Sequence, residues 1–373
     1  MNESRLQALQ RPGEALVSPD DTRLQYVGRI DDADKKAPRM SWVLSGIHFG
    51  LRGRHARLLV RNTHGFWQNA LGVVVNGQQS VLPLQNDVLE ALDLGPFLTD
   101  GDNDVTVFKR MDACHLIAFY GIITGEPAAL FRAPSPPNRR MEVYGDSVSA
   151  GEVCEAAGYV GLPDPGHNGQ YSNGYMSYAG QAARLLHAQC HNISQGGISL
   201  QDGRGYFRAP DTLGMLSCFD KTAYNPALGP VKAWDFSRYR PHVVIVALGQ
   251  NDAHPDDFMK DDPDGEKALR WKEEYARFLA ALRARYPAAR IILTTTLLMH
   301  DPSWDRAIGE VAGMLRRTDE KIHHFLYSRN GAATPGHPRI PEHAEMAREL
   351  SAFIESLGES VWLDGEAEAP VTT

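Results

Sequence analysis

A serine follows a short apolar run near the middle of the chain, in the motif Gly-Asp-Ser-Val-Ser at residues 145–149. Residues 141–144 are typical of a buried strand, and working loops in parallel sheets follow the carboxyl ends of the strands. The hydroxyl of Ser147 could therefore point out of the sheet as a nucleophile. The motif is not Gly-x-Ser-x-Gly, so the α/β-hydrolase interpretation loses its main support. By itself it also fits a turn capped by Asp146 or Ser147.

Two later loops carry groups that could donate hydrogen bonds to a reacting oxygen. The segment Asn-Ile-Ser-Gln-Gly-Gly-Ile-Ser at residues 192–199 contains two glycines, which let a backbone N–H approach a ligand closely. The segment Gly-Gln-Asn-Asp at residues 249–252 places the Asn251 amide after an apolar run, where it can donate to a developing oxyanion. Taken singly, the two segments are also consistent with an ordinary glycine-rich turn and an Asx turn.

A histidine completes this set near the C-terminus, in the motif Gly-His-Pro at residues 336–338. A lone histidine in a loop is usually only a polar surface residue. His337, however, directly precedes the last predicted helix, where a general base for Ser147 is needed. Four modest signals in this order indicate nucleophilic catalysis more strongly than any one of them.

The second half of the chain alternates buried strands with helices, a pattern that predicts a parallel sheet flanked by helices. The expected strands cover residues 141–144, 189–193, 243–248, 291–296 and 322–327. Helices are expected at 175–187 and along two apolar stripes, which run from Ala268 to Leu282 and from Ala344 to Leu357.

The first half has a different pattern, and a proline-rich connector at residues 133–140 separates the two. Short β-like runs with turn signals such as Asn76-Gly77 favour an antiparallel sandwich. The expected strands are 42–49, 56–61, 71–75, 81–84, 104–108 and 116–123. We therefore predict a β-sandwich domain at 1–135 and an α/β domain at 136–373.

Composition excludes several classes of protein. The 373 residues carry 38 Lys and Arg against 46 Asp and Glu, a net charge of −8, with no dense basic cluster, so we expect no nucleic-acid partner. The apolar runs are too short to span a bilayer. The N-terminus lacks the features of a signal peptide, which predicts a cytoplasmic protein, or a secreted or periplasmic one whose leader has been removed. Four dispersed cysteines suggest free, buried thiols.

The ordered set of Gly-Asp-Ser, glycine turn, Gly-x-Asn-Asp and His-Pro resembles the SGNH hydrolase superfamily, also called GDSL-type esterases, over residues 141–358. The first half narrows the resemblance. Residues 49–61, 73–77 and 105–110 look like the N-terminal jelly-roll domain of carbohydrate esterase family two, and residues 234–241 are similar to that family's approach to its Asn-Asp block.

The resemblance implies a β-sandwich (jelly roll) followed by a three-layer α/β/α domain, and a serine esterase that removes O-acetyl groups from acetylated xylan, glucomannan or their oligosaccharides, without metal or organic cofactor. Ser147 is then the nucleophile and His337 its base. The N–H groups of Ser147 and Gly197 and the amide of Asn251 form the oxyanion hole. Trp234 is the aromatic residue expected to stack on a sugar.

One position departs from the superfamily pattern. The orienting Asp usually stands two or three residues before the His, but Pro335 and Thr334 occupy those positions here. Either a Ser-His dyad operates, with a backbone carbonyl orienting the imidazole, or a distant carboxylate such as Asp301 substitutes. The missing Asp also leaves open a second interpretation, in which the chain is a carbohydrate-binding protein with an inactive catalytic half. A short-chain lipid or thioester esterase is a further alternative.

Other candidate groups have weaker support. His187, Cys190 and His191 could bind a metal only if one helix carried them all, and a strand is expected there. A glycosidase would need two carboxylates, for which Asp146 and Asp252 are available, although we expect both to support their loops. The long segments 151–173 and 203–234 follow working loops, so we expect them to wall the substrate cleft.

Overall fold

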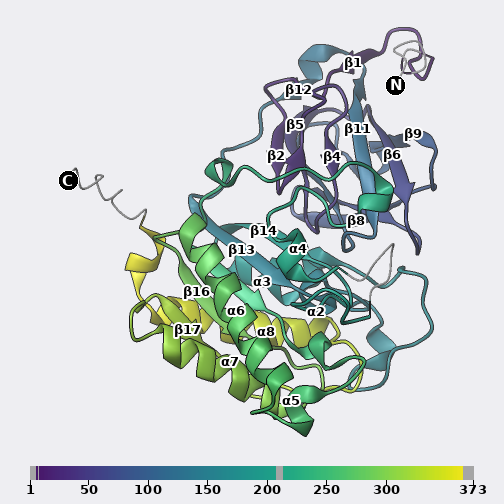
Figure 1. The fold of residues 1–373 in the computed structure, drawn as a ribbon. Coiled ribbons are helices and arrows are strands. Elements are labelled where there is room, and N and C mark those ends of the chain that lie inside the picture. The colour runs from purple at the N-terminus through teal and green to yellow at the C-terminus, as the bar shows by residue number, and fades with distance from the viewer. Residues whose placement is uncertain (1–5, 7, 207–212, 364–373) are drawn as a thin grey trace.

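The computed structural model describes residue 6 and residues 8–206 and 213–363. Within these residues an all-β part, which includes the chain's first strands, lies against a larger part that alternates strands and helices (Figure 1). The predicted β-sandwich followed by an α/β/α domain is confirmed. Within residues 6, 8–206 and 213–363, no helix is long and apolar enough to cross a membrane.

Two antiparallel sheets pack face to face in the first part. One has the order β3-β4-β11-β6-β9, with β1 also paired to β11, and the other has the order β12-β5-β10-β7-β8, with β2 also paired to β5. Inward-facing side chains such as Ile47, Phe49, Val73 and Val105 form the core between them. The strands are β1 (Ala15–Val17), β2 (Gln25–Val27), β3 (Ile30–Asp31), β4 (Arg39–Met40), β5 (Gly46–Arg52), β6 (Ala56–His64), β7 (Ala70–Val75), β8 (Gln78–Pro83), β9 (Leu89–Asp93), β10 (Asp102–Lys109), β11 (His115–Thr124) and β12 (Leu130–Phe131).

The Asn76-Gly77 turn predicted from the sequence joins β7 to β8. Both residues have positive φ, 50° and 83°, as a two-residue hairpin turn requires. Five of the expected strands overlap β6, β7, β8, β10 and β11, whereas the expected run at 42–49 forms a strand only from Gly46. The short strands at the sheet edges were not predicted, because two or three residues carry no periodicity.

The second part is built on a parallel sheet of order β14-β13-β15-β16-β17. Its strands are β13 (Arg139–Gly145), β14 (Ala188–Ser194), β15 (Val243–Ala247), β16 (Arg290–Thr294) and β17 (Ile322–His324), in agreement with the five expected strands. The helices are α2 (Ser147–Ala150), α3 (Tyr178–Leu185), α4 (Met215–Cys218), α5 (Phe258–Asp261), α6 (Glu266–Arg285), α7 (Pro302–Leu315) and α8 (Ile340–Ser356).

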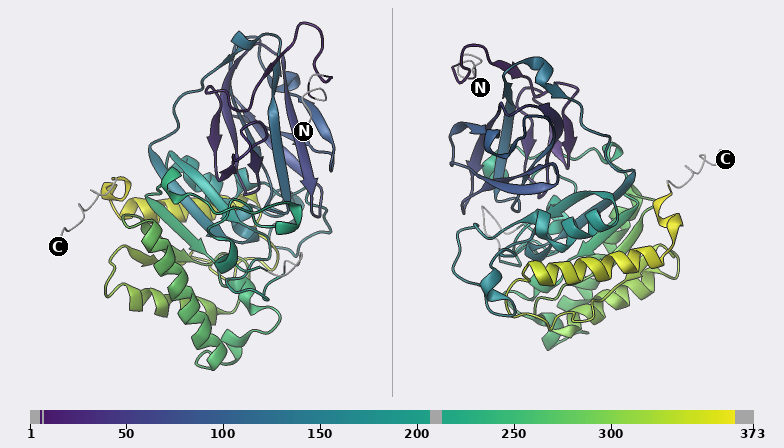
Figure 2. Two further views of the ribbon diagram at one scale, coloured as in Figure 1. Left: turned by 45° about the horizontal axis from the view of Figure 1, so that its top comes forward. Right: turned by 180° about the vertical axis from the view of Figure 1, so that it is seen from behind.

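Successive residues of each strand face opposite layers of helices, as the pleat of a strand requires. Val143 and Ile245 pack with residues of α3 and α8, whereas Tyr144 and Val244 pack with residues of α6 and α7. In Figure 2 the view from behind shows α8, in yellow, on one side of the sheet, and the other view shows the green helices of the opposite layer. The α6 stripe predicted from the sequence is buried along its whole length. The helix α7 was not predicted.

The two parts meet through buried polar contacts as well as apolar ones. Arg29, between β2 and β3, forms an ion pair with Glu142 of β13 at 2.9 Å, and both side chains are fully buried. Trp42 donates its indole N–H to the carbonyl of Lys221 at 3.1 Å. The sandwich is thus fixed against the sheet that carries the predicted catalytic residues. The boundary at 135/136 stays a prediction, although β13 begins only at Arg139.

Candidate active site

The turn after β13 presents Ser147 at the carboxyl edge of the sheet. Asp146 is the N-cap of the single-turn helix α2, and its carboxylate accepts a hydrogen bond from the N–H of Val148 at 3.0 Å. Gly145 has no room for a side chain, since an added Cβ would lie 2.1 Å from Oγ of Ser149. The chain therefore turns sharply, and Ser147, the first residue of the helix, lines a pocket.

His337 lies in the loop before α8 and lines the same pocket as Ser147. Its ring Nε2 is 2.8 Å from Oγ of Ser147. The following helix begins with a capping box, in which Arg339 donates its backbone N–H to Glu342 at 2.8 Å. The predicted pairing of serine and histidine is therefore present in the geometry.

A carboxylate orients the imidazole, and it belongs to Asp164. Its Oδ2 is 2.5 Å from Nδ1 of His337, and its Oδ1 accepts the backbone N–H of His337 and a guanidinium N–H of Arg339, each at 2.9 Å. Because an ionised carboxylate only accepts, Nδ1 carries the proton and Nε2 is free to accept from Ser147. The three side chains have the geometry of a Ser-His-Asp triad.

This arrangement corrects the expectation for the third group. Asp301 instead caps α7, where it accepts the N–H of Ser303 at 2.9 Å. Thr334 is buried and donates its hydroxyl to the carbonyl of Gly336. Asp164 lies in the segment 151–173, which we expected to wall the cleft, and no periodic pattern marks it. Only a search for carboxylates in the segments that follow the working loops could have proposed it.

Electrostatics favour a charged Asp164 beside His337. Burial by itself raises the pKa of Asp164, but the hydrogen bonds from His337 and Arg339 outweigh it and hold that pKa below its usual range. Burial lowers the pKa of His337, yet its hydrogen bond to Asp164 and the charges of Glu152 and Asp146 raise it above the ordinary value. The imidazole is therefore a stronger base than a free histidine.

Ser147, Gly197 and Asn251, which are predicted to donate hydrogen bonds to an acyl oxygen, all line the pocket. The first N–H groups of a helix have no partner within it, and Ser147 is such a residue. Gly196 donates its N–H to Asp112 at 2.8 Å and so is not available, whereas the N–H of Gly197, at φ 70°, has no acceptor among the described residues. The geometry thus favours Gly197, as we expected.

The third predicted donor, the Asn251 side chain, also lines the pocket. Its amide donates to the carbonyl of Ile198 at 3.0 Å and, over a longer 3.3 Å, to Asp146. The longer of these hydrogen bonds is the weaker one, and exchanging it for a substrate oxyanion costs little. The role of Asn251 in an oxyanion hole stays a prediction that this placement supports.

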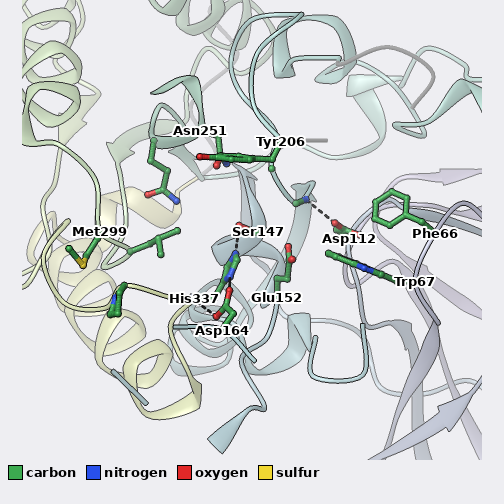
Figure 3. A pocket seen from close by; sticks show the side chains of 16 residues that line it. Phe66, Trp67, Asp112, Ser147, Glu152, Asp164, Tyr206, Asn251, Met299 and His337 are labelled. Carbon is green, nitrogen blue, oxygen red and sulfur yellow. Dashed lines mark hydrogen bonds and ion pairs between the residues drawn. The ribbon is translucent and has the colours of Figure 1, made fainter. Parts of the chain in front are cut away.

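The pocket has a volume of about 510 Å³ and lies between the two parts of the molecule (Figure 3). Phe66 and Trp67 from the sandwich form one wall, with Tyr206 above them and Met299 opposite. The lining residues are Phe66, Trp67, Asp112, Ser147, Glu152, Asp164, Gly196, Gly197, Tyr206, Gln250, Asn251, Leu298, Met299, Pro335, Gly336 and His337. Both long segments contribute to it, through Asp164 and Tyr206, as we expected.

Comparison with known protein families assigns both parts of the chain. A model described as carbohydrate esterase 2 N-terminal matches residues 26–134, and one described as the GDSL-like lipase/acylhydrolase family matches residues 143–327. The first part thus carries a carbohydrate esterase 2 N-terminal domain and the second a GDSL-like lipase/acylhydrolase domain, as the resemblance implied. The GDSL-like domain confirms the enzyme class expected from the sequence, a carboxylic ester hydrolase.

Curated relatives match nearly the whole length of this chain. It is 27% identical over 346 residues to the cellulase/esterase CelE of Acetivibrio thermocellus, covering 90% of this chain but only 40% of that protein. It is 23% identical to an acetylxylan esterase/glucomannan deacetylase of Cellvibrio japonicus, covering 91% of this chain and 90% of the relative.

Solved structures agree with this relationship. A family two carbohydrate esterase from Clostridium thermocellum in complex with cellohexaose is 26% identical, with a TM-score of 0.74 over 91% of this chain and 100% of that one. The structure of a family two carbohydrate esterase from Cellvibrio japonicus, at 22% identity, has the same fold, with a TM-score of 0.76 over 94% of this chain and 99% of that one.

Trp234 does not line the pocket. Its side chain is only 5% exposed and packs between the guanidinium groups of Arg29 and Arg238, with His191 at its edge. The prediction that Trp234 stacks on a sugar is therefore wrong, because the residue belongs to the buried contact between the two parts. Trp304, Tyr171 and Tyr175 do not line the pocket either.

The remaining sequence candidates are structural. His191 is buried, stacks on Tyr239 with ring centroids 3.5 Å apart and accepts the N–H of Gly28, whereas His187 is exposed at the end of α3. Asp252 is buried away from the pocket and accepts the N–H of Leu200 at 2.9 Å, so it supports its loop as expected. Among the described residues no cluster of three or more His, Cys, Asp or Glu could hold a metal ion.

Proposed function

We propose that this chain is a family two carbohydrate esterase that removes O-acetyl groups from xylan, glucomannan or the oligosaccharides derived from them, through an acyl-enzyme on Ser147. The observation that carries the proposal is the 2.8 Å contact between Ser147 and His337, with Asp164 behind the imidazole, at the base of a pocket walled by Trp67. The relative named as an acetylxylan esterase and glucomannan deacetylase supports the substrate class.

The first half of the reaction forms the acyl-enzyme. Oγ of Ser147 attacks the acetyl carbonyl carbon while Nε2 of His337 takes the hydroxyl proton. The N–H groups of Ser147 and Gly197 and the amide of Asn251 stabilise the resulting oxyanion. When the intermediate collapses, the bond to the sugar oxygen breaks and that oxygen takes the proton from His337.

The second half returns the enzyme to its starting state. A water molecule gives a proton to His337 and attacks the acetyl-serine carbonyl, and acetate leaves as Ser147 recovers its proton from the imidazolium. Asp164 holds the Nδ1 proton and stabilises the imidazolium in both halves. The proton transfers use Ser147, His337 and Asp164, which are already within hydrogen-bond reach of one another.

The aromatic wall supports a carbohydrate as the alcohol part of the ester. Aromatic faces cover the apolar C–H faces of sugar rings, and Trp67 has Phe66 beside it at 5.1 Å between ring centroids. The structure of a relative in complex with cellohexaose is consistent with this choice. The alternative of a binding protein with an inactive catalytic half loses its only support, because Asp164 supplies the missing carboxylate.

The test is acetate release from acetylated xylo- and manno-oligosaccharides, with Ser147→Ala measured beside the wild type. The proposal predicts release by the wild type and none by the variant at an unchanged melting temperature. No release from either substrate by a folded wild type would overturn it. A series of 4-nitrophenyl esters checks the acyl group, since equal or greater activity on butyrate would favour the lipid or thioester alternative.

A further inference from the structure

Glu152 lines the active-site pocket but takes no part in the proposed acyl transfer. It stands one residue after the left-handed Gly151 that ends α2, and its backbone N–H donates to the carbonyl of Ser147 at 2.9 Å. Its side chain is 8% exposed, and among the described residues its carboxyl group has no hydrogen-bond partner. Figure 3 shows it between His337 and Trp67, with its oxygens turned into the pocket.

A second carboxylate lies nearby. Oε2 of Glu152 and Oδ2 of Asp112 lie 2.6 and 2.7 Å from the point that a Cβ on Gly196 would occupy. Asp112 is satisfied, because it accepts from Gly196 and from the amide of Gln195. The carboxyl group of Glu152 has no such partner among the residues that the structure describes. Burial raises the pKa of Glu152 and the charge of His337 lowers it, but with the charges of Asp112 and Asp164 the pKa lies above the usual range.

Glu152 is largely buried, and its carboxyl oxygens face the pocket without a hydrogen bond from the described protein residues, so a ligand that fills the pocket must supply one or leave the carboxyl group desolvated at a cost in free energy. No lysine or arginine lines this pocket in the described part of the chain, and the charge of His337 acts on Glu152 without a hydrogen bond between the two side chains. A substrate group can therefore supply the missing hydrogen bond. A hydroxyl group both donates and accepts, so it can bind Glu152 in either protonation state. An anionic substituent would be repelled by Glu152 and Asp112 together.

We propose that Glu152 binds a free hydroxyl next to the acetylated one, so that the enzyme selects partly acetylated neutral sugars over fully acetylated or uronate-bearing ones. This inference rests on the proposed function, since it assigns the substrate class of the same pocket. Glu152 would act as a specificity residue that contacts the sugar, and Ser147, His337 and Asp164 would act on any acetyl ester.

The test compares two substrates in the wild type and in Glu152→Ala and Glu152→Gln. A monoacetylated xyloside has a free hydroxyl beside the ester, and 4-nitrophenyl acetate has none. We expect Glu152→Ala to lower kcat/KM for the xyloside about 10- to 100-fold, the range for a hydrogen bond to a charged group. The loss with 4-nitrophenyl acetate, measured at a pH where His337 is neutral in the wild type and in the variants, should be much smaller, so the ratio of kcat/KM for the two substrates falls. Glu152→Gln, which can still accept, should recover part of that ratio.

Glu155→Gln is the matched control. This residue lies in the same segment, pairs with Arg110 and does not line the pocket, so the ratio of kcat/KM for the two substrates should stay at the wild-type value. Equal losses on both substrates in Glu152→Ala, or no loss on the xyloside, would overturn the inference. A wild type that cleaves 4-nitrophenyl acetate but no sugar acetate would overturn the proposed function, and the inference with it.

Discussion

Asp112 of the β-sandwich accepts the backbone N–H of Gly196 in the catalytic part of the chain, at 2.8 Å. The same carboxylate oxygen accepts the side-chain amide of Gln195, also at 2.8 Å. These two contacts fix the turn in which Gly197 presents its N–H to the pocket. Asp112 is itself held by the buried ammonium group of Lys109, which donates to backbone carbonyls of the loop between β10 and β11. The sandwich thus helps to shape the predicted oxyanion hole.

Asp112→Ala should therefore lower kcat for 4-nitrophenyl acetate by about 10- to 100-fold, with little change in KM. This loss is somewhat smaller than the one expected when an oxyanion-hole donor is removed outright. Asp112→Asn keeps an acceptor oxygen for Gly196 and should recover most of the activity. Arg238→Ala serves as the control, because it breaks a contact with Asp32 between the same two parts but away from the pocket. A loss confined to KM, or an equal loss in the control, would contradict this role.

The assignment of Asp164 predicts a sharp contrast between two aspartates. Asp164→Ala should lower kcat by about 10²- to 10⁴-fold, because His337 loses the group that fixes its tautomer and stabilises its charge. Asp301→Ala should stay within about 2-fold of the wild type in activity and lose about 1 kcal/mol of stability, as expected for an N-cap.

Steady-state kinetics and thermal unfolding of both variants measure this contrast. Thr334→Ala is a further control, since Thr334 is near His337 in sequence and bonds only the loop backbone. If Asp301→Ala were as inactive as Asp164→Ala, the carboxylate seen beside His337 would not be the one that matters.

The parts of the site that could be predicted from the sequence are those next to regular elements. Ser147 and Asn251 follow strongly apolar strands, and His337 precedes a helix with a clear stripe, so their place at one edge of the sheet follows from the topology. The strand and helix periods that place them also located all five strands of the parallel sheet.

Asp164 and Trp234 could not be placed in this way. Asp164 lies in an irregular segment whose path depends on tertiary contacts, such as the hydrogen bond from Gln68 of the sandwich to Asn168 at 3.1 Å. Trp234 lies in a comparable segment, and its burial depends on Arg29, which is distant in sequence. Local patterns carry no information on such contacts, so aromatic residues in loops cannot be sorted into pocket and interior from sequence alone.

The pH dependence of kcat/KM should report the raised pKa of His337. The base must be neutral to accept the serine proton, so activity is lost as the pH falls through this pKa, which lies above the ordinary 6.5. Burial opposes this shift, and the carboxylates of Asp164, Glu152 and Asp146 produce it. Removing one of these charges lowers the pKa of His337.

In Asp164→Asn the acid limb of the kcat/KM profile should therefore move to lower pH, and the plateau value of kcat/KM should also fall. Glu152→Gln should move the limb in the same direction without the large fall in plateau on 4-nitrophenyl acetate. The profiles can be recorded with that substrate between about pH 4 and 9, a range that brackets the ordinary pKa of histidine. A limb that stays in place or moves to higher pH in Asp164→Asn would show that a group other than His337 controls it.

Substitutions of Trp67 and Trp234 should have different effects, the first on sugar binding and the second on the stability of the fold. Trp67 lines the pocket, whereas Trp234 is buried and packs against Arg29 and Arg238. Trp67→Ala should raise KM for an acetylated oligosaccharide about 5- to 10-fold with little change in kcat, because it loses the stacking surface. Trp67→Phe keeps an aromatic face and should recover most of the affinity.

Trp234→Ala should leave that KM unchanged and destabilise the fold by about 3 to 5 kcal/mol, as expected for a large side chain removed from the interior. Initial rates over a range of oligosaccharide concentrations, together with urea unfolding of the same preparations, give both quantities. A raised KM in a folded Trp234→Ala variant would restore Trp234 as a sugar-binding residue, and would mean that the wall formed by Trp67 is not where the sugar lies.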